Sequence, residues 1–315
     1  MVSYQRRPVH VVFRRVGAGT FKITTMLRSC TSRVARAPVG LLLALTMLGG
    51  FAAVARAAVP RSAIVTISSV RSPRGVLVTS GGWPYCEQAR PLARRARLAL
   101  VCGGYAKDGY RGRKLRHLRW LDWGNAAYLD ELAARVAAVH RRIGGMLVFA
   151  GVSYSGYGVA VLAARHPELR PDLVVVVDSY LDLAARRAHL PAGHETAREI
   201  DRETGGTPAA LARRSPNVDG LARLVRDGTK LVVVWSVADG ERREFRGATC
   251  DATANAAPLA AVARRAGRPV DGWVTRSRHG ATFWRYGSRL VLGATVGTKV
   301  TFTPNGAIPK NAVCS

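Results

Sequence analysis

A serine within a glycine-rich turn is the residue of this 315-residue sequence best placed to carry chemistry. Ser153 follows an apolar run at residues 146–151 and precedes another at 159–164, an order that predicts a strand, a sharp turn and a helix. A turn that pushes a serine hydroxyl outward needs small residues two positions before and two after it, and Gly151 and Ser155 stand there. The pattern predicts Ser153 as a nucleophile, with serine where the second glycine of G-x-S-x-G is usual.

A serine hydroxyl attacks a carbonyl only when a base takes its proton, and an acid normally orients that base. His279 follows the last of the predicted strands, and Asp239 follows the one before it. Because the carboxyl ends of parallel strands open on one edge of a sheet, we expect Ser153, Asp239 and His279 to converge as a catalytic triad. Three other carboxylates remain as alternatives for the acid: Glu241, Asp251 and Asp178.

Acyl transfer also needs backbone N–H groups that stabilise the oxyanion of the transition state. Tyr154, directly after the nucleophile, is one expected donor. The second is expected in the loop at residues 81–84, from Gly82 or Trp83. The aromatic side chains of this region suggest an apolar or aromatic contact surface: Trp83, Tyr85, Tyr154 and Tyr157. This chemistry requires no metal and no organic cofactor, and no cysteine–histidine spacing suits zinc.

The elements that would position these residues are legible from hydrophobic periodicity. Seven short runs rich in β-branched residues predict strands: residues 63–68, 76–80, 98–102, 146–151, 173–178, 230–237 and 270–275. Segments of helical period lie between them, at residues 128–139, 155–166 and 259–265. The chain is therefore predicted to be an α/β protein with a mainly parallel sheet flanked by helices. A polar, helix-prone insertion at about 181–228 is expected to form a small cap.

The segments around the serine resemble the catalytic domain of prolyl-oligopeptidase-type serine peptidases and related bacterial α/β hydrolases. The similarity includes Gly151-Val152-Ser153-Tyr154-Ser155-Gly156-Tyr157, an upstream Asp108-Gly109-Tyr110 and a later Gly205-Gly206-Thr207-Pro208. It implies the α/β-hydrolase fold and catalytic roles for Ser153, Asp239 and His279. The sequence departs from that group in Ser155, in the absence of a preceding β-propeller, and in a tail rich in β-formers at residues 290–302, where a closing helix is usual.

The first 58 residues differ from the rest and have the order of a secretory signal peptide. A basic stretch precedes the apolar run 39–48, and Ala55-Arg56-Ala57 follows as a cleavage motif. The basic region is long, so Met26 is a candidate for the true start. The predicted mature hydrolase domain is residues 59–315, secreted or associated with the cell envelope. An uncleaved membrane anchor is the alternative.

Four cysteines follow this segment, and an even number in an exported chain favours disulfides. We expect Cys86 to pair with Cys102 and Cys250 with Cys314. The formal net charge is +28, yet the arginines are scattered instead of forming one stripe with interleaved aromatics. That distribution argues against a specific nucleic-acid partner and leaves electrostatic association with an anionic cell envelope.

Together these patterns predict a secreted serine hydrolase that cleaves an ester or amide bond of a small molecule or peptide through an acyl-enzyme intermediate. The competing hypothesis is a non-catalytic protein of the same fold that binds ligands at the cell envelope. The two differ in whether a histidine and an acid support Ser153.

Overall fold

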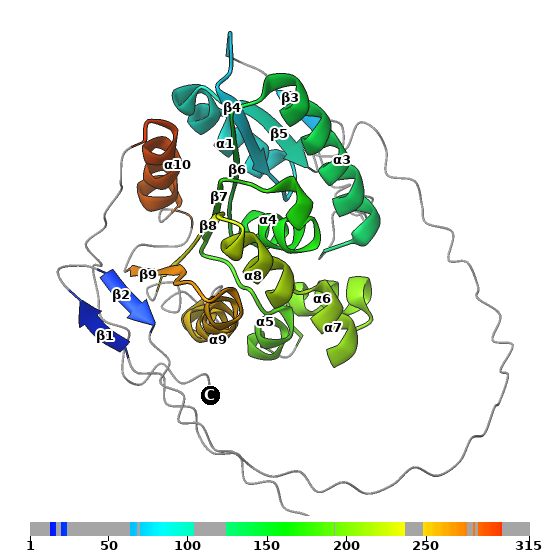
Figure 1. Cartoon of the computed structure of the whole chain (residues 1–315). Coiled ribbons are helices and arrows are strands. Elements are labelled where there is room, and N and C mark those ends of the chain that lie inside the picture. Colours follow the sequence, from blue (N-terminus) through cyan, green and yellow to red (C-terminus); the bar gives the residue numbers. More distant parts are fainter. Residues whose placement is uncertain are drawn as a thin grey trace, which may run out of the picture.

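One seven-stranded sheet organises the computed structural model of the chain (Figure 1). The structure describes residues 13–16, 20–23, 64–67, 70–103, 124–191, 193–236, 248–275, 280 and 283–297. The strand order is β3-β5-β4-β6-β7-β8-β9; β3 pairs antiparallel with β5, and the other six strands are parallel. The strands are β3 Ile64–Ile67, β4 Gly75–Thr79, β5 Ala99–Gly103, β6 Met146–Val152, β7 Leu173–Val177, β8 Lys230–Ser236 and β9 Asp271–Thr275.

These strands coincide with the seven predicted runs to within one residue at each end. They read as apolar throughout because helices cover both faces of the sheet. In β7, Val174 and Val176 point into one core cluster, whereas Leu173, Val175 and Val177 point into the other. The predicted mainly parallel sheet is confirmed, and the carboxyl ends of its six parallel strands lie at one edge.

Helices form a layer on each side of this sheet (Figure 1). On one side lie α1 Trp83–Ala96 and α10 Ser288–Thr295, whose apolar residues join the smaller core cluster. On the other side α3 Ala126–Ile143, α4 Tyr154–Arg165, α8 Val218–Arg226 and α9 Ala248–Ala266 contribute to the larger one. Short turns of other helix types cover Pro167–Leu169 (η4) and Phe283–Gly287 (η7). The chain therefore has three layers, with the sheet in the middle.

The C-terminal part of the described chain corrects one expectation. Residues 290–302 were expected as a β-rich tail, but residues up to Thr295 belong to helix α10. Leu290 and Val291 are buried in the cluster that also contains α1 residues, so tertiary packing overrides the β propensity of this stretch. A closing helix is thus present, as in the group that the sequence resembles.

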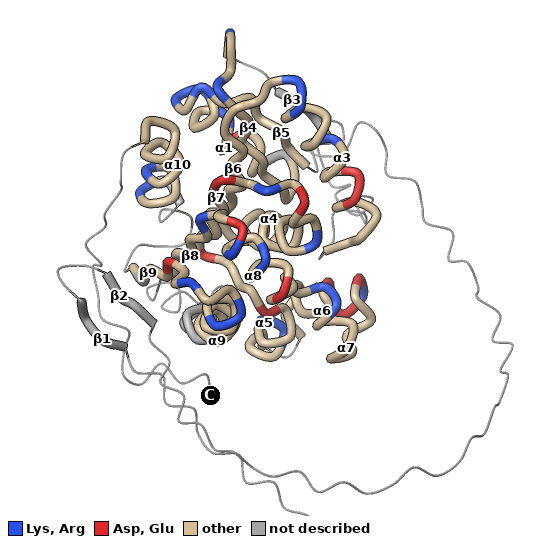
Figure 2. The backbone as a smooth tube through the Cα atoms, viewed as in Figure 1, with Lys and Arg blue, Asp and Glu red and all other residues tan. Residues whose placement is uncertain are grey.

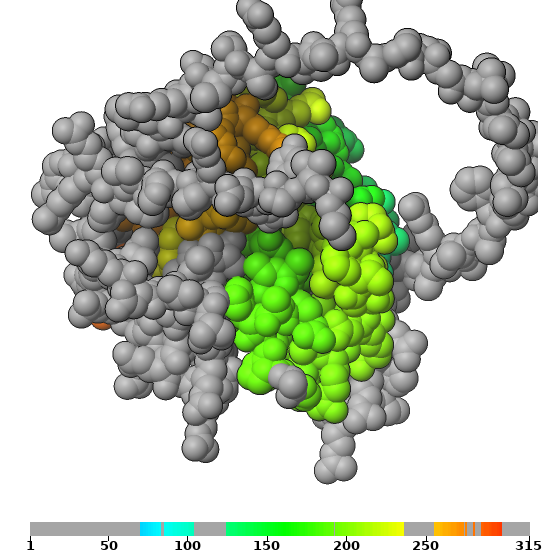
Figure 3. Space-filling view, turned by 90° about the horizontal axis from the view of Figure 1, so that it is seen from below, coloured from blue at the N-terminus to red at the C-terminus, as the bar shows by residue number. Residues whose placement is uncertain are grey.

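The predicted insertion between β7 and β8 folds as helices. These are α5 Leu183–His189, α6 Glu195–Thr204 and α7 Pro208–Arg214, followed by α8. Helix α8 packs on α4 and α9 as an ordinary sheet-flanking helix. The insertion proper is therefore α5 to α7, whose green to yellow-green residues occupy part of the face of the molecule seen from below (Figure 3).

The predicted signal segment, residues 1–58, lies almost wholly outside the described residues. Its described parts are β1 Phe13–Val16 and β2 Thr20–Ile23, which pair antiparallel. Among the helices that the structure describes, none combines the length and the apolar character needed to cross a membrane.

Candidate active site

Ser153 sits at a strained turn between β6 and α4. Its φ of 55° and ψ of −127° lie in a region that residues with a side chain rarely adopt. The turn is fixed on both sides, because the Ser153 N–H donates to the Val177 carbonyl at 2.8 Å and its carbonyl accepts from Tyr157 at 3.1 Å. A strained, tightly held serine after a parallel strand is the geometry that the sequence predicted for a nucleophile.

Close approach of strand and helix explains the small residues around the turn. A Cβ on Gly151 would lie 2.5 Å from the backbone of Ser155. A Cβ on Gly156 would lie 2.9 Å from the Ser179 side chain, on the segment after β7. Gly156 therefore supplies the close packing on the helix side, one position later than the G-x-S-x-G spacing requires.

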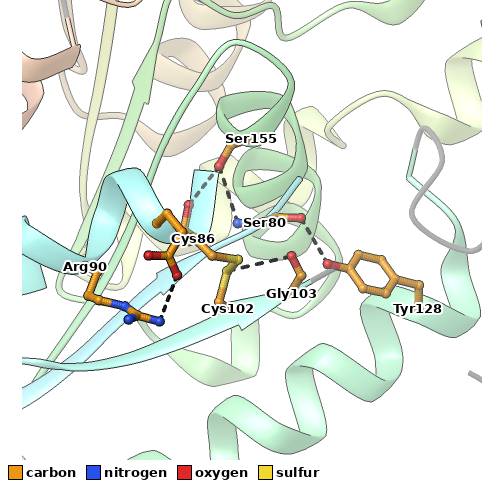
Figure 4. The surroundings of a disulfide bond; sticks show 9 residues. Ser80, Cys86, Arg90, Cys102, Gly103, Tyr128 and Ser155 are labelled. Carbon is orange, nitrogen blue, oxygen red and sulfur yellow. Dashed lines mark hydrogen bonds and ion pairs between the residues drawn. A yellow bond between two sulfur atoms is a disulfide. The ribbon is translucent and has the colours of Figure 1, made fainter. Parts of the chain in front are cut away.

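Ser155, the departure from that motif, is an integrated part of the site. It is fully buried, and its hydroxyl lies 2.8 Å from the Thr79 hydroxyl and accepts the Ser80 N–H at 3.4 Å (Figure 4). Thr79 is the last residue of β4 and Ser80 begins the loop after it, where the second oxyanion donor is expected. Ser155 thus ties that loop to the nucleophile turn, and its extra atoms are compensated by hydrogen bonds.

The structure describes the backbone of all three predicted oxyanion donors, two of which lie in or just after the loop that follows β4. The Gly82 N–H donates to the carbonyl of Gly103 at 3.2 Å, so it is already engaged and gives no support to Gly82 as a donor to substrate. Trp83 is the first residue of α1, directly after this turn. Tyr154 is the first residue of α4, as its predicted role requires.

Tyr85 in α1 is a site residue that sequence reasoning missed. Its hydroxyl is hydrogen-bonded both to the Ser153 side chain and to the backbone N–H of Tyr154. Burial raises the pKa of Tyr85, an effect that these two hydrogen bonds oppose, so the phenol stays protonated and can donate at neutral pH. The sequence placed Tyr85 only within an aromatic surface. Tyr157 does not belong to such a surface, because it is buried and its hydroxyl donates to the Arg214 carbonyl.

A disulfide fixes the helix that carries Tyr85. Cys86, the next residue, is bonded to Cys102 of β5, and both are fully buried (Figure 4). This is one of the two pairings expected from the sequence. Cys250 lies in α9, and the second predicted pairing involves Cys314, outside the described residues.

The two other predicted triad members, Asp239 and His279, also fall outside the described residues. Asp178 was named from the sequence as one alternative to Asp239, and it lies within the part of the chain that the structure describes. It follows β7, is 3% exposed and has a φ of 44°. Its Oδ2 accepts the backbone N–H of Gly280 at 3.2 Å. Gly280 is thus held at the end of β7.

A small cavity of about 10 Å³ lies beside the turn, lined by Thr79, Tyr85, Gln88, Ala89, Gly151, Val152 and Ser155. A cavity of that size holds about one water molecule, so it is not a substrate pocket.

Comparison with known proteins identifies the fold of this chain. No protein-family model and no curated protein sequence matches the chain. Among solved structures, the uncomplexed acylaminoacyl peptidase of Pyrococcus horikoshii matches with a TM-score of 0.50 at 15% identity, over 74% of this chain and 37% of that one. Its orthorhombic crystal form matches with a TM-score of 0.53 at 14% identity, over 78% and 41%. The chain has the α/β-hydrolase fold.

The chain spans about two fifths of the length of that peptidase. A lower match, with a TM-score of 0.41 and 11% identity, is the Pyrococcus furiosus esterase Pf2001, over 74% of this chain and 84% of that one.

Three other histidines have structural contacts. His140 bonds the Gly145 carbonyl through Nε2 at 2.8 Å, and His166 lies between Glu168 and Asp130. His194 caps α6, where its Nδ1 accepts the Thr196 N–H. Each of these contacts is with a residue away from Ser153.

Proposed function

We propose that this protein is a serine hydrolase in which Ser153 attacks an ester or amide carbonyl. The Ser153 oxygen bonds to the carbonyl carbon while His279 takes the hydroxyl proton. His279 then returns that proton to the leaving alcohol or amine as the C–O or C–N bond breaks, and water releases the acyl group by the same steps. The observation that carries the proposal is the strained Ser153 turn, next to which two donors meet.

Those donors are the Tyr154 N–H and the Tyr85 hydroxyl, which already bond to each other. A carbonyl oxygen entering beside Ser153 would take the place of this mutual contact: Tyr154 would donate its N–H to the oxyanion, and the Tyr85 O–H would turn toward it. Both groups already lie beside Ser153, so only the hydrogen-bond partner of each changes when the oxyanion forms. The backbone N–H of Trp83 is a third candidate donor.

The proposed substrate is an ester or an amide, because those are the bonds that this chemistry cleaves. Two carboxylates compete to orient His279: Asp239, by its place after β8, and Asp178, at the end of β7. The similarity to a peptidase structure at about 15% identity supports the fold, and the acyl donor is a peptide or a small ester.

Labelling with a fluorophosphonate probe tests the proposal, because the probe bonds only to an activated serine. We expect the wild-type protein to be labelled and both Ser153→Ala and His279→Ala to be unlabelled while still folded. A folded wild-type protein that resists the probe and hydrolyses no p-nitrophenyl ester would instead favour the non-catalytic binding protein.

We also propose that the protein is exported. The apolar run 39–48 with the motif ending at Ala57 supports this, as does the Cys86–Cys102 disulfide, since disulfides persist in oxidising compartments. The mass of the exported product tests it. A chain starting near Val59 indicates cleavage, and a longer chain indicates a retained anchor.

Electrostatic association with an anionic envelope polymer completes the proposal. Arginines from three segments gather where the strands begin, at the sheet edge opposite Ser153 (Figure 2). They are Arg71, Arg74, Arg94, Arg95, Arg97, Arg141 and Arg142, all exposed. The Arg74 N–H donates to the Arg97 carbonyl at 2.8 Å, and Met146 after α3 donates to the Arg74 carbonyl at 3.2 Å, so the segments are neighbours. We call these seven residues the arginine edge.

A further inference from the structure

We propose that Asp178, and not Asp239, is the positioning residue that orients His279. This inference rests on the proposed serine hydrolase and assigns the acid of its relay. It starts from one contact between distant parts of the chain: the Gly280 N–H donates to Asp178 Oδ2 at 3.2 Å, across 102 residues.

The contact matters because of the sheet order. Ser153 directly follows β6, Asp178 directly follows the adjacent strand β7, and β9 lies two strands beyond β7. Neighbouring strands are about 4.8 Å apart, so a residue that leaves β9 must travel roughly 14 Å to reach the end of β6. The bond to Asp178 holds Gly280 at β7, next to the nucleophile strand. His279 is the residue directly before Gly280 in the sequence, which is why the proposal assigns Asp178 to it.

Asp178 is built into the site instead of lying at the surface. It is 3% exposed and adopts a left-handed φ of 44°, a conformation that persists only where the surroundings determine it. Its backbone N–H donates to the Val234 carbonyl at 2.7 Å, which fixes it to β8. The preceding residue, Val177, accepts the Ser153 N–H, so nucleophile and carboxylate are joined through adjacent strand ends.

The segment after Asp178 is held as firmly. Asn255 of α9 is fully buried; its amide donates to the Ser179 carbonyl at 2.5 Å, and its oxygen accepts the Leu181 N–H at 2.7 Å. Ser179 also packs against the first turn of α4, because a Cβ on Gly156 would meet it at 2.9 Å. A carboxylate held from both sides is suited to orient an imidazole, which requires a fixed direction.

The chemistry assigns Asp178 a defined task. An ionised carboxylate that accepts the Nδ1–H of a histidine selects the tautomer whose Nε2 takes the serine proton, and it stabilises the imidazolium that results. Asp178 does not itself gain a proton in this step. A carboxylate has about four acceptor sites, so one group can accept both a backbone N–H and a ring N–H.

The test compares Asp178→Asn with Asp239→Asn in the full-length protein, by the rate of fluorophosphonate labelling and of p-nitrophenyl ester hydrolysis across pH. Asparagine keeps an oxygen for the Gly280 N–H, so the loop contact survives while the charge is lost. We expect Asp178→Asn to slow both rates by about 10⁴-fold, and Asp239→Asn to leave them within about threefold of wild type.

The pH profile separates positioning from mere structural support. A neighbouring carboxylate raises the pKa of a histidine, so its loss should move the rising limb of the rate profile to lower pH in Asp178→Asn. Wild-type rates and an unshifted profile in Asp178→Asn, or the loss and the shift in Asp239→Asn, would overturn the assignment. If Asp178→Asn does not fold, Asp239→Asn alone decides, because unchanged labelling there excludes Asp239. A wild-type protein that is not labelled at Ser153 refutes the hydrolase proposal itself.

Discussion

Ser155 has a role that the motif alone does not reveal. Its hydroxyl joins the nucleophile turn to Thr79, at the end of β4, and to Ser80, directly after it, and both Ser155 and Thr79 are buried. Replacing it by glycine would restore the usual motif yet leave the buried Thr79 hydroxyl without this partner. Unsatisfied buried hydroxyls cost about 1–3 kcal/mol.

We therefore predict that Ser155→Gly and Ser155→Ala each lower the free energy of unfolding by that amount, measured by urea denaturation. Ser288→Ala is the control, because its buried hydroxyl has no hydrogen-bond partner among the residues that the structure describes. It should be close to neutral. A Ser155→Gly protein as stable as wild type would mean that the hydroxyl is incidental.

Tyr85 is predicted to act on rate and not on stability. Tyr85→Phe removes the hydroxyl next to Ser153 and the Tyr154 N–H. Loss of one oxyanion donor lowers kcat by about 10²- to 10³-fold, which ester hydrolysis would measure. Because burial raises the pKa of Tyr85, its ionisation should not limit the rate below about pH 10, the ordinary tyrosine value.

Tyr157→Phe is the matched control for that experiment. Its hydroxyl donates to the Arg214 carbonyl at 2.7 Å and lies on the same helix as the nucleophile turn. We expect it to reduce stability with little change in kcat. Equal kcat values for Tyr85→Phe and wild type would remove Tyr85 from the oxyanion site.

Among the elements, α1 connects the disulfide to the candidate site. Cys86 follows Tyr85 and is bonded to Cys102 on β5, which closes a loop across 16 residues. A loop of that length contributes about 3 kcal/mol by restricting the unfolded chain. The double variant Cys86→Ala/Cys102→Ala should lose about that much unfolding free energy in urea, and reductant should destabilise wild type but not the variant. Identical urea curves would contradict this.

The strands of this fold were predictable because burial on both faces leaves continuous apolar runs. Helix α1 was not, since Gly81, Gly82 and Pro84 indicate a loop and Pro91 interrupts the helical pattern. In the structure Pro84 lies in the first turn, where its missing N–H costs nothing. Tyr85 was missed for the same reason: only the placement of α1 against the Ser153 turn brings its hydroxyl into the site.

The Ser153 turn was predictable from local spacing, whereas the acid was not. Chain order favours Asp239, the residue after the next-to-last strand, over Asp178. The Gly280 contact that favours Asp178 joins residues 102 positions apart. No local pattern carries such information, because it depends on the path of the chain after β9.

At the scale of the whole molecule, charge is distributed unequally relative to the site. Helices that cover a parallel sheet generally run opposite to its strands, so the basic last turns of α1 and α3 lie at the edge where β4 and β6 begin. The three segments that form the arginine edge contain no carboxylate, as the sequence at residues 70–75, 91–98 and 139–146 shows. An anionic polymer held there would leave the Ser153 edge open to substrate.

This arrangement predicts salt-dependent binding to a polyanion through one edge. On a heparin column, replacing Arg94, Arg95 and Arg97 by glutamine should lower the salt concentration of elution more than the same change at three exposed arginines elsewhere: Arg198, Arg213 and Arg285. Both triple variants lose the same charge, so a difference between them reports local concentration of positive potential and not net charge. Screening over about 10 Å at 0.1 M salt makes binding depend on arginines that act together. Equal shifts in the two variants would mean that the total charge of +28 drives adsorption and that the edge has no special part in it.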